Sequence, residues 1–338
     1  MEKKLKFKDY FALYQLSLRD YFWRVDGRQT MNRIRGGDYM NAAYLFGMFI
    51  AYGLPICVLF CGVNLVKSVL LAPLRLLGIL PAVTASGLGS SFLLALFLFA
   101  VFSPVTLNFD RVKYNLHFKT SNWWKNTGIT PSQIKRDKGL YGEYIATMAT
   151  EKCLENSGIY GRVFNSVIIP TVGEDFNEID LISVNEAGIH VIEAKAKGGS
   201  LRGDVSGHDW YHTIGSEEHI MFNPILQNAG HIRTLSRYLR TALPGEAIDE
   251  RDYINVVMFC LSGIEGHFNY DNPPSEYFLG MADGEDGYRN TNILEIYGRR
   301  FTKEEVDRIA DAIAALPTYT YEQIQEKVRQ REARRNGQ

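Results

Sequence analysis

Two uncharged apolar stretches set the hydropathy pattern of the first third of the chain. They cover residues 42–66 and 82–105 and contain no Asp, Glu, Lys or Arg. A helix needs about 20 apolar residues to cross a bilayer, so the pattern predicts two transmembrane helices within residues 41–106. Basic side chains are frequent before and after this pair and sparse within it, which places both termini in the cytoplasm. We therefore expect a multi-pass protein of the cell (inner) membrane with the lipid bilayer as a partner; the alternative is a buried helix pair in a soluble protein.

The rest of the chain alternates between helical and strand patterns. Apolar residues recur at helical spacing in 138–154, and short apolar runs typical of buried strands follow. The predicted elements are helices at 138–154, 222–239, 302–315 and 321–335, and strands at 161–169, 179–184, 189–196, 255–261 and 292–297. This order predicts an α/β fold with a mixed sheet flanked by helices.

These patterns divide the 338 residues into five parts. They are a basic and aromatic N-terminal segment at 1–40, two transmembrane helices at 41–106, a connector at 107–137, an α/β domain at 138–300 and C-terminal helices at 301–338. The N-terminal segment and the connector should lie on the cytoplasmic side, because they carry the flanking basic residues.

Composition narrows the choice of function only slightly. The formal net charge of −1 gives no overall basic field that would indicate a nucleic-acid binder, although a local basic patch is compatible with it. The four cysteines show no zinc-ligand spacing with a histidine partner. We therefore expect a reduced compartment and no disulfide framework.

Asp180, Glu193 and Lys195 form the candidate reactive group. The runs 179–184 and 189–196 flank a turn and predict a hairpin. Side chains alternate along a strand, so Glu193 and Lys195 share one face, and the hairpin brings Asp180 to the same sheet edge. Charges are rare in such apolar strands without a partner or a metal. Two carboxylates and an ammonium group indicate a phosphodiester hydrolase that uses Mg²⁺ or Mn²⁺; an ordinary solvated strand is the alternative.

The residues themselves suggest how such a site would work. Asp180, Glu193 and the carbonyl of Ala194 are candidate ligands of one metal ion, with Glu143 on it through water or on a second ion. Lys195 either stays protonated and orients the attacking water, or acts as a base if it is desolvated and unpaired. Glu143 also lies in the first turn of its helix, where a carboxylate favours the helix dipole without any catalytic role.

Several short motifs follow one another in a recognisable order. They are Gly139-x-x-Gly142-Glu143, Ile169-Pro170, Glu178-Ile-Asp180, Gly188-Ile-x-Val-Ile-Glu193-Ala-Lys195, Gly203-Asp204 with Trp210, and Asn223-Pro224-x-x-Gln227. Together they resemble the nuclease-related domain (NERD) family, a branch of the PD-(D/E)XK nuclease superfamily. The resemblance covers roughly residues 139–239 and implies a restriction-endonuclease-like fold.

The resemblance also implies a role for each matching residue. The implied roles are metal binding for Asp180 and Glu193, positioning or activation of water for Lys195, a supporting metal contact for Glu143, and support of the site for Gln227. Gln227 has an alternative role as a bridge between elements. Ala196 departs from the polar residue expected in many relatives, which puts the hydrogen bonds around the ligands in doubt.

These interpretations combine into one functional expectation with an alternative. We expect a membrane-anchored, metal-dependent (endo)deoxyribonuclease that hydrolyses phosphodiester bonds, with DNA as the expected substrate and RNA as the other candidate. The alternative is a catalytically inactive nucleic-acid-binding or sensing module tethered to the membrane. Cutting both strands of a duplex would require two sites, so a homodimer is one expected assembly. We predict no metal ligand among His190, His208, His212, His219, His231 and His267.

Overall fold

The computed structural model describes residues 5, 8–10, 12–13, 16, 118–171, 176–261, 264–269, 276–282 and 286–336. The transmembrane helices predicted within 41–106 lie outside these residues, as does most of the segment 1–40. Within the described part, no helix combines the length and apolar character needed to cross a bilayer. One compact unit comprises Met1–Leu13 and His117–Gln338 and contains both β-sheets.

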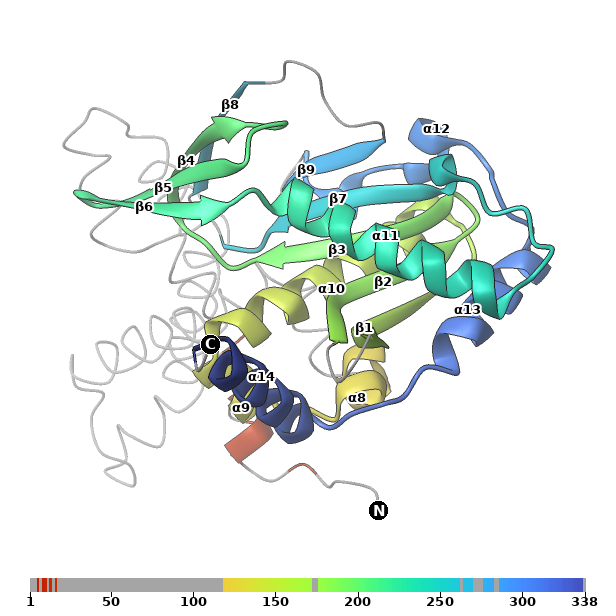
Figure 1. Ribbon diagram of the computed structural model, residues 1–338, viewed down its shortest axis with the longest axis horizontal. Coiled ribbons are helices and arrows are strands. Elements are labelled where there is room, and N and C mark those ends of the chain that lie inside the picture. The colour runs from red at the N-terminus through yellow and green to blue at the C-terminus, as the bar shows by residue number, and fades with distance from the viewer. Residues whose placement is uncertain are drawn as a thin grey trace, which may run out of the picture. The chain divides into compact units, whose positions relative to one another are not determined.

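The main sheet of this unit has five strands in the order β1-β2-β3-β7-β9 (Figure 1). Its strands are β1 (Gly161–Pro170), β2 (Phe176–Asn185), β3 (Gly188–Lys195), β7 (Tyr253–Phe259) and β9 (Tyr277–Met281). The first three strands pair antiparallel, whereas β7 runs parallel to β3 and β9 parallel to β7. The hairpin predicted around residues 185–188 therefore forms the centre of a mixed sheet.

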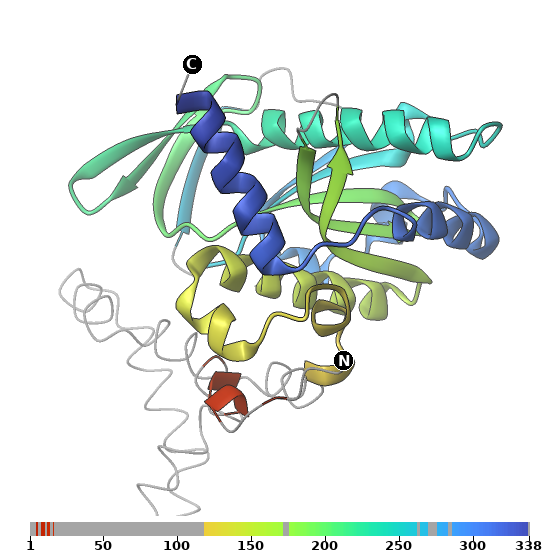
Figure 2. The ribbon, with the colours of Figure 1, turned by 60° about the horizontal axis from the view of Figure 1, so that its bottom comes forward.

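Helices cover both faces of this sheet. The described helices are α8 (Asn122–Thr127), α9 (Pro131–Arg136), α10 (Lys138–Ser157), α11 (Pro224–Ala242), α12 (Ile293–Tyr297), α13 (Lys303–Ala314) and α14 (Tyr321–Asn336), with 3₁₀ turns η2 (Phe118–Thr120), η3 (Glu250–Asp252) and η4 (Tyr288–Asn290). In Figure 2, α11 lies on one side of the sheet and α10 on the other. Two-sided cover explains why every residue of β7 is buried and why its sequence is apolar except at Asn255.

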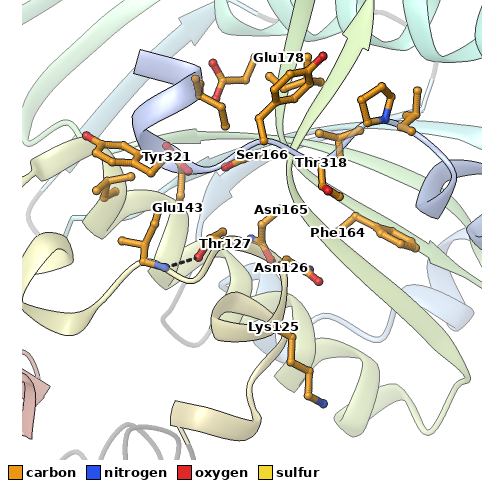
Figure 3. Close-up of a pocket in the computed structure, with 18 of the residues that line it drawn as sticks. Lys125, Asn126, Thr127, Glu143, Phe164, Asn165, Ser166, Glu178, Thr318 and Tyr321 are labelled. Carbon is orange, nitrogen blue, oxygen red and sulfur yellow. Dashed lines mark hydrogen bonds between the residues drawn. The ribbon is translucent and has the colours of Figure 1, made fainter. Parts of the chain in front are cut away.

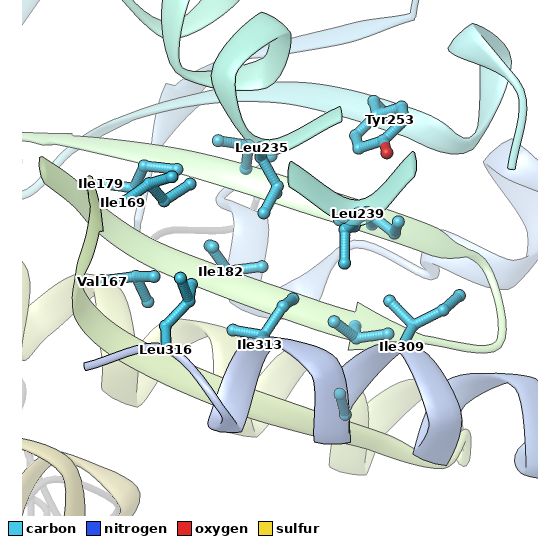
Figure 4. Close-up of a cluster of buried hydrophobic side chains, with 14 of the residues drawn as sticks. Val167, Ile169, Ile179, Ile182, Leu235, Leu239, Tyr253, Ile309, Ile313 and Leu316 are labelled. Carbon is cyan, nitrogen blue, oxygen red and sulfur yellow. The ribbon is translucent and has the colours of Figure 1, made fainter. Parts of the chain in front are cut away.

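One hydrophobic core joins α11 and α13 to the sheet (Figure 4). Leu235 and Leu239 of α11 and Ile309 of α13 are buried against Ile182 of β2. Thr302 begins α13 with the predicted capping box, accepting from the backbone nitrogen of Glu305 at 3.3 Å. Removing a buried leucine from such a core costs about 2–5 kcal/mol, so this cluster fixes both helices on the sheet.

A second, four-stranded sheet continues from the end of β3. Its order is β6-β5-β4-β8, formed by β4 (Gly199–Asp204), β5 (Asp209–Ile214), β6 (Glu217–Phe222) and β8 (Ile264–Asn269). Trp210 is fully buried, and its indole nitrogen donates to the carbonyl of Asp204 at 2.7 Å. A Cβ on Gly203 would lie 2.4 Å from the Trp210 ring. The Gly203-Asp204 and Trp210 motif therefore holds this second sheet together.

One sequence-based prediction of secondary structure differs from the structure. Residues 292–297, predicted as a strand, form helix α12, because the Asn292 side chain accepts from the backbone nitrogen of Glu295 at 3.4 Å and Gly298 ends the helix. A short apolar run does not distinguish a strand from a helical turn. The predicted connector 107–137 contains α8 and α9 in its described part.

Candidate functional site

The β2–β3 hairpin places Asp180 beside Glu193. Leu181 of β2 pairs with Ile192 of β3 in an antiparallel register, so the preceding and following residues lie at the same level of the sheet. Asp180 Oδ2 accepts a hydrogen bond from the backbone nitrogen of Ala194 at 2.9 Å. Ala194 lies between Glu193 and Lys195 in the sequence. This hydrogen bond therefore holds the Asp180 carboxylate at the end of β3, next to both of these residues.

The neighbouring strand β1 is distorted opposite Asp180. The β1–β2 ladder pairs Asn165 with Leu181 and Val167 with Ile179. Ser166, which lies between them, has φ of 49°, a left-handed conformation that non-glycine residues adopt rarely. Such strain costs about 1–3 kcal/mol and gathers at functional sites. No sequence pattern indicated it.

Glu193 Oε1 is the centre of a tight polar cluster. It accepts from Lys195 Nζ at 2.6 Å and from Gln227 Nε2 at 2.8 Å. Lys195 Nζ also donates to Gln227 Oε1 at 3.1 Å. The three side chains thus form a closed triangle, in which β3 supplies two members and α11 the third. These contacts hold the Glu193 carboxylate in one orientation.

His231 of α11 approaches the other oxygen of the same carboxylate. Its Nε2 lies 3.3 Å from Glu193 Oε2, and its Nδ1 lies 2.6 Å from Asn177 Oδ1 on β2. From the sequence we predicted only that His231 is no metal ligand, and its contact with Glu193 was not expected. The only sequence signal is its spacing of four residues from Gln227, which puts the two on one helix face.

Glu143 enters the site from the opposite helix, α10. It lines a cavity of about 430 Å³ together with Glu178, Ser166 and Tyr321 (Figure 3). Burial raises the pKa of the Glu143 carboxyl well above its usual range, and the charges of Asp180 and Glu178 raise it further. Glu143 is thus an electrostatic neighbour of Asp180, while the Lys195 triangle lies on the side of α11.

The three carboxyl groups respond differently to this environment. Burial, followed by the charge of Glu193, raises the pKa of Asp180 well above its usual range. Burial alone would raise the pKa of Glu193 as well, but the adjacent His231 ring and the Lys195 charge outweigh it, and the net pKa is lowered. Perturbed carboxyl groups of this kind cluster at functional sites more often than elsewhere.

The donor set is suited to a divalent cation. The charge of Asp180 raises the pKa of Glu143, so a divalent cation near both carboxyl groups would relieve an electrostatic cost. Glu193 Oε2 is buried and accepts no hydrogen bond from the described residues. Among those residues, no three His, Cys, Asp or Glu side chains are gathered as a ready-made metal site. The carboxylates supply the oxygen ligands and negative charge that a hard cation prefers, but in the described part of the chain they are not gathered around one point. Lys195 and Gln227 hold Glu193 in this arrangement.

The other histidines lie away from this cluster. His190 is fully buried and its Nδ1 contacts the Tyr288 hydroxyl at 2.7 Å. His212 Nε2 lies 2.6 Å from the carbonyl of Gly198. His208 contacts Asp209 at the protein surface. Of the histidines considered from the sequence, His231 is the one that the structure brings to Glu193.

Comparisons with known proteins agree with the motifs in this region. Neither a curated protein nor a solved structure matches the chain. A mixed sheet flanked by helices fits a nuclease-like fold, and a nuclease-related function is consistent with it. Residues 138–260, which contain all five predicted site residues, match the family model described as the nuclease-related domain, NERD.

Proposed function

We propose that the chain is a nuclease that depends on a divalent cation, hydrolyses phosphodiester bonds of DNA, and is anchored to a membrane through residues 41–106. The observation that supports this most strongly is the cluster of Asp180, Glu193 and Lys195 at the end of the β2–β3 hairpin, in contact with Gln227. Its carboxylates supply cation ligands, and its ammonium group supplies a donor for phosphate oxygens.

Asp180, Glu193 and Glu143 would hold the cation. Mg²⁺ or Mn²⁺ bound there supplies a nucleophilic water at neutral pH and neutralises charge on the phosphate. Gln227 keeps the Glu193 carboxylate in place by donating to its Oε1. The hydrogen bond from Ala194 does the same for Asp180. Both carboxylates are thus oriented before any substrate arrives, which lowers the reorganisation needed for catalysis.

Lys195 takes the role of an ammonium donor in this proposal. Its Nζ contacts one carboxylate oxygen and one amide oxygen, Glu193 Oε1 and Gln227 Oε1, a set of partners that suits a charged group with three donors. We therefore favour its role in orienting the attacking water or binding the scissile phosphate over a role as a base.

Cleavage assays on the purified full-length protein test the proposal. Mg²⁺ and Mn²⁺ are titrated against plasmid DNA, single-stranded DNA and RNA, with Asp180→Ala and Glu193→Ala as loss-of-ligand variants and His208→Ala as a matched surface control. We expect the two ligand variants to lose at least about 100-fold in cleavage rate, and the control to cut like the wild type. Equal cutting by the wild type and both ligand variants would refute the proposed function.

A further inference from the structure

A chain of side-chain contacts links Glu193 to the middle of α11 and to β2. Thr234 donates its hydroxyl to the carbonyl of Gly230 at 3.1 Å, so its oxygen is left to accept from Asn177 Nδ2 at 2.9 Å. The Asn177 amide is thereby oriented with its Oδ1 toward His231, 2.6 Å from Nδ1.

This chain fixes the state of one imidazole nitrogen. Because Asn177 Oδ1 can only accept, His231 Nδ1 must carry a proton and donate. The other nitrogen, Nε2, lies 3.3 Å from Glu193 Oε2, and it donates a hydrogen bond to that oxygen only when the ring carries a proton on both nitrogens. A hydrogen bond to one ring nitrogen usually determines which nitrogen carries the proton in the neutral ring.

The carboxylate on which this chain of contacts acts is almost fully buried. The Glu193 side chain is 4% exposed and that of His231 12% exposed. Glu193 Oε1 is held by Lys195 and Gln227, whereas Oε2 accepts no hydrogen bond from the described residues and has His231 as its neighbour. The His231 ring therefore limits rotation of the Glu193 carboxylate at Oε2, the oxygen that Lys195 and Gln227 do not contact.

We propose that His231 is a positioning residue that orients Glu193 Oε2 toward a divalent cation, with Asn177 and Thr234 holding the ring in place. The inference rests on the proposed function, since it concerns how one ligand of that cation site is aimed. Groups that orient a metal ligand typically affect cation affinity by about 10–100-fold.

Two isosteric substitutions separate this role from a purely structural one. In His231→Gln the amide nitrogen takes the place of Nε2, so the contact with Glu193 survives while that with Asn177 is lost. In His231→Asn the amide group takes the place of Nδ1, so the opposite contact survives. His231→Ala removes both, and His208→Ala is the matched control on an exposed histidine.

The probe is Mn²⁺ alone, titrated into the full-length protein without DNA, with the melting temperature of each variant as a check on folding. We expect His231→Ala and His231→Asn to weaken Mn²⁺ binding about 10-fold, while His231→Gln and His208→Ala keep most of the wild-type affinity. Raising the Mn²⁺ concentration should then restore cleavage by His231→Asn.

The opposite pattern overturns the inference. If His231→Asn binds Mn²⁺ like the wild type while His231→Gln does not, the histidine acts as a brace between β2 and α11. If all His231 variants bind normally but Glu193→Ala does not, the inference fails and the proposed function stands. If Glu193→Ala binds Mn²⁺ as the wild type does, or the wild type binds none, the cation site and the proposed function fail together.

Discussion

Gly142 of α10 lies directly against Ala196, the residue that follows Lys195. A Cβ on Gly142 would lie 2.9 Å from the Cβ of Ala196 and 3.4 Å from its backbone nitrogen. Each partner is the chain neighbour of a predicted site residue, Glu143 on the helix and Lys195 on the strand. The close approach of two small residues is therefore what brings the helix carboxylate to the end of β3.

Substituting Gly142 by Ala should lower both stability and activity. Alanine favours a helix over glycine by about 1 kcal/mol, but forcing a methyl group into this contact typically costs about 1–3 kcal/mol. We expect the clash to prevail, α10 to move away from β3, and Glu143 to leave Asp180. Thermal unfolding and the cleavage assay measure the two effects.

Two further variants test this explanation. Ala196→Gly removes the opposing methyl group, so the double variant should recover most of the lost stability. Gly230→Ala on α11 is the matched control, because its Cβ would lie an ordinary 3.7 Å from the Arg233 side chain. If the Gly142→Ala protein has a higher melting temperature than the wild type, the contact between α10 and Ala196 accommodates a methyl group and this explanation is wrong.

The central elements follow from the sequence because burial on two faces leaves a strong signal. Strands β2, β3 and β7 are buried over most of their length and apolar residues recur along each of them, and the hairpin turn lies where this pattern breaks. Alternation along β3 was enough to predict that Glu193 and Lys195 share a face, and their side chains are in contact.

The second sheet and the contacts of His231 and Ser166 depend on residues that are far apart in the sequence, so no local sequence pattern predicts them. Strand β6 is mostly exposed and β4 pairs with β8, which lies far along the chain. His231 and Asn177 meet because α11 docks across β2. The strained φ of Ser166 likewise results from how β1 and β2 are joined around Asp180. These features are set by packing between distant segments.

Replacing Asp180 by Asn should stabilise the cation-free protein at neutral pH. Burial and the charge of Glu193 raise the pKa of Asp180 above its unfolded value of 3.8. A carboxyl group with a raised folded pKa contributes stability that is present below the unfolded pKa and is lost as pH rises through the folded pKa. The wild type therefore carries a penalty at neutral pH that the neutral amide avoids.

Melting temperatures measured in chelator at several pH values test this. The advantage of Asp180→Asn over the wild type should grow from about pH 4 to about pH 7, and added Mg²⁺ should shrink it by stabilising only the wild type. Asp209→Asn, at an exposed carboxylate, serves as the control. An advantage that is absent at neutral pH would argue against repulsion among the site carboxylates.

His190 should make the fold sensitive to acid. Burial, followed by the charge of Arg300, lowers the pKa of His190 from 6.5 to about 3. In the unfolded chain His190 takes up a proton near pH 6.5, whereas in the folded chain it stays neutral down to about pH 3. The free energy of unfolding is therefore highest above pH 6.5 and decreases as the pH falls toward 3. The magnitude is on the order of a few kcal/mol, because each pKa unit corresponds to about 1.4 kcal/mol.

His190→Asn isolates this effect. Its amide oxygen takes the place of Nδ1 and can accept from the Tyr288 hydroxyl, but it does not titrate. We expect the melting temperature of the wild type to fall more steeply than that of the variant between about pH 7 and about pH 4. Parallel curves for the two proteins would assign the acid sensitivity to other groups.

Lys195→Ala should separate cation binding from catalysis. Lys195 Nζ and the cation compete for the same carboxylate, since Nζ lies 2.6 Å from Glu193 Oε1. Removing the ammonium group leaves Glu193 freer to bind a cation, so Mn²⁺ affinity should stay the same or increase. The cleavage rate should fall by about 100–1,000-fold, the usual loss when one donor to a developing charge is removed.

Calorimetry with Mn²⁺ and single-turnover cleavage at saturating Mn²⁺ measure the two quantities on the same preparation. Lys195→Gln is the informative companion, because its amide retains a hydrogen bond to Glu193 without the charge. If it also loses cleavage, the charge itself is needed at the phosphate. If Lys195→Ala cleaves DNA at the wild-type rate, the only role left to Lys195 is to hold Glu193. If Lys195→Ala no longer binds Mn²⁺, the ammonium group organises the carboxylate ligand and does not compete with the cation.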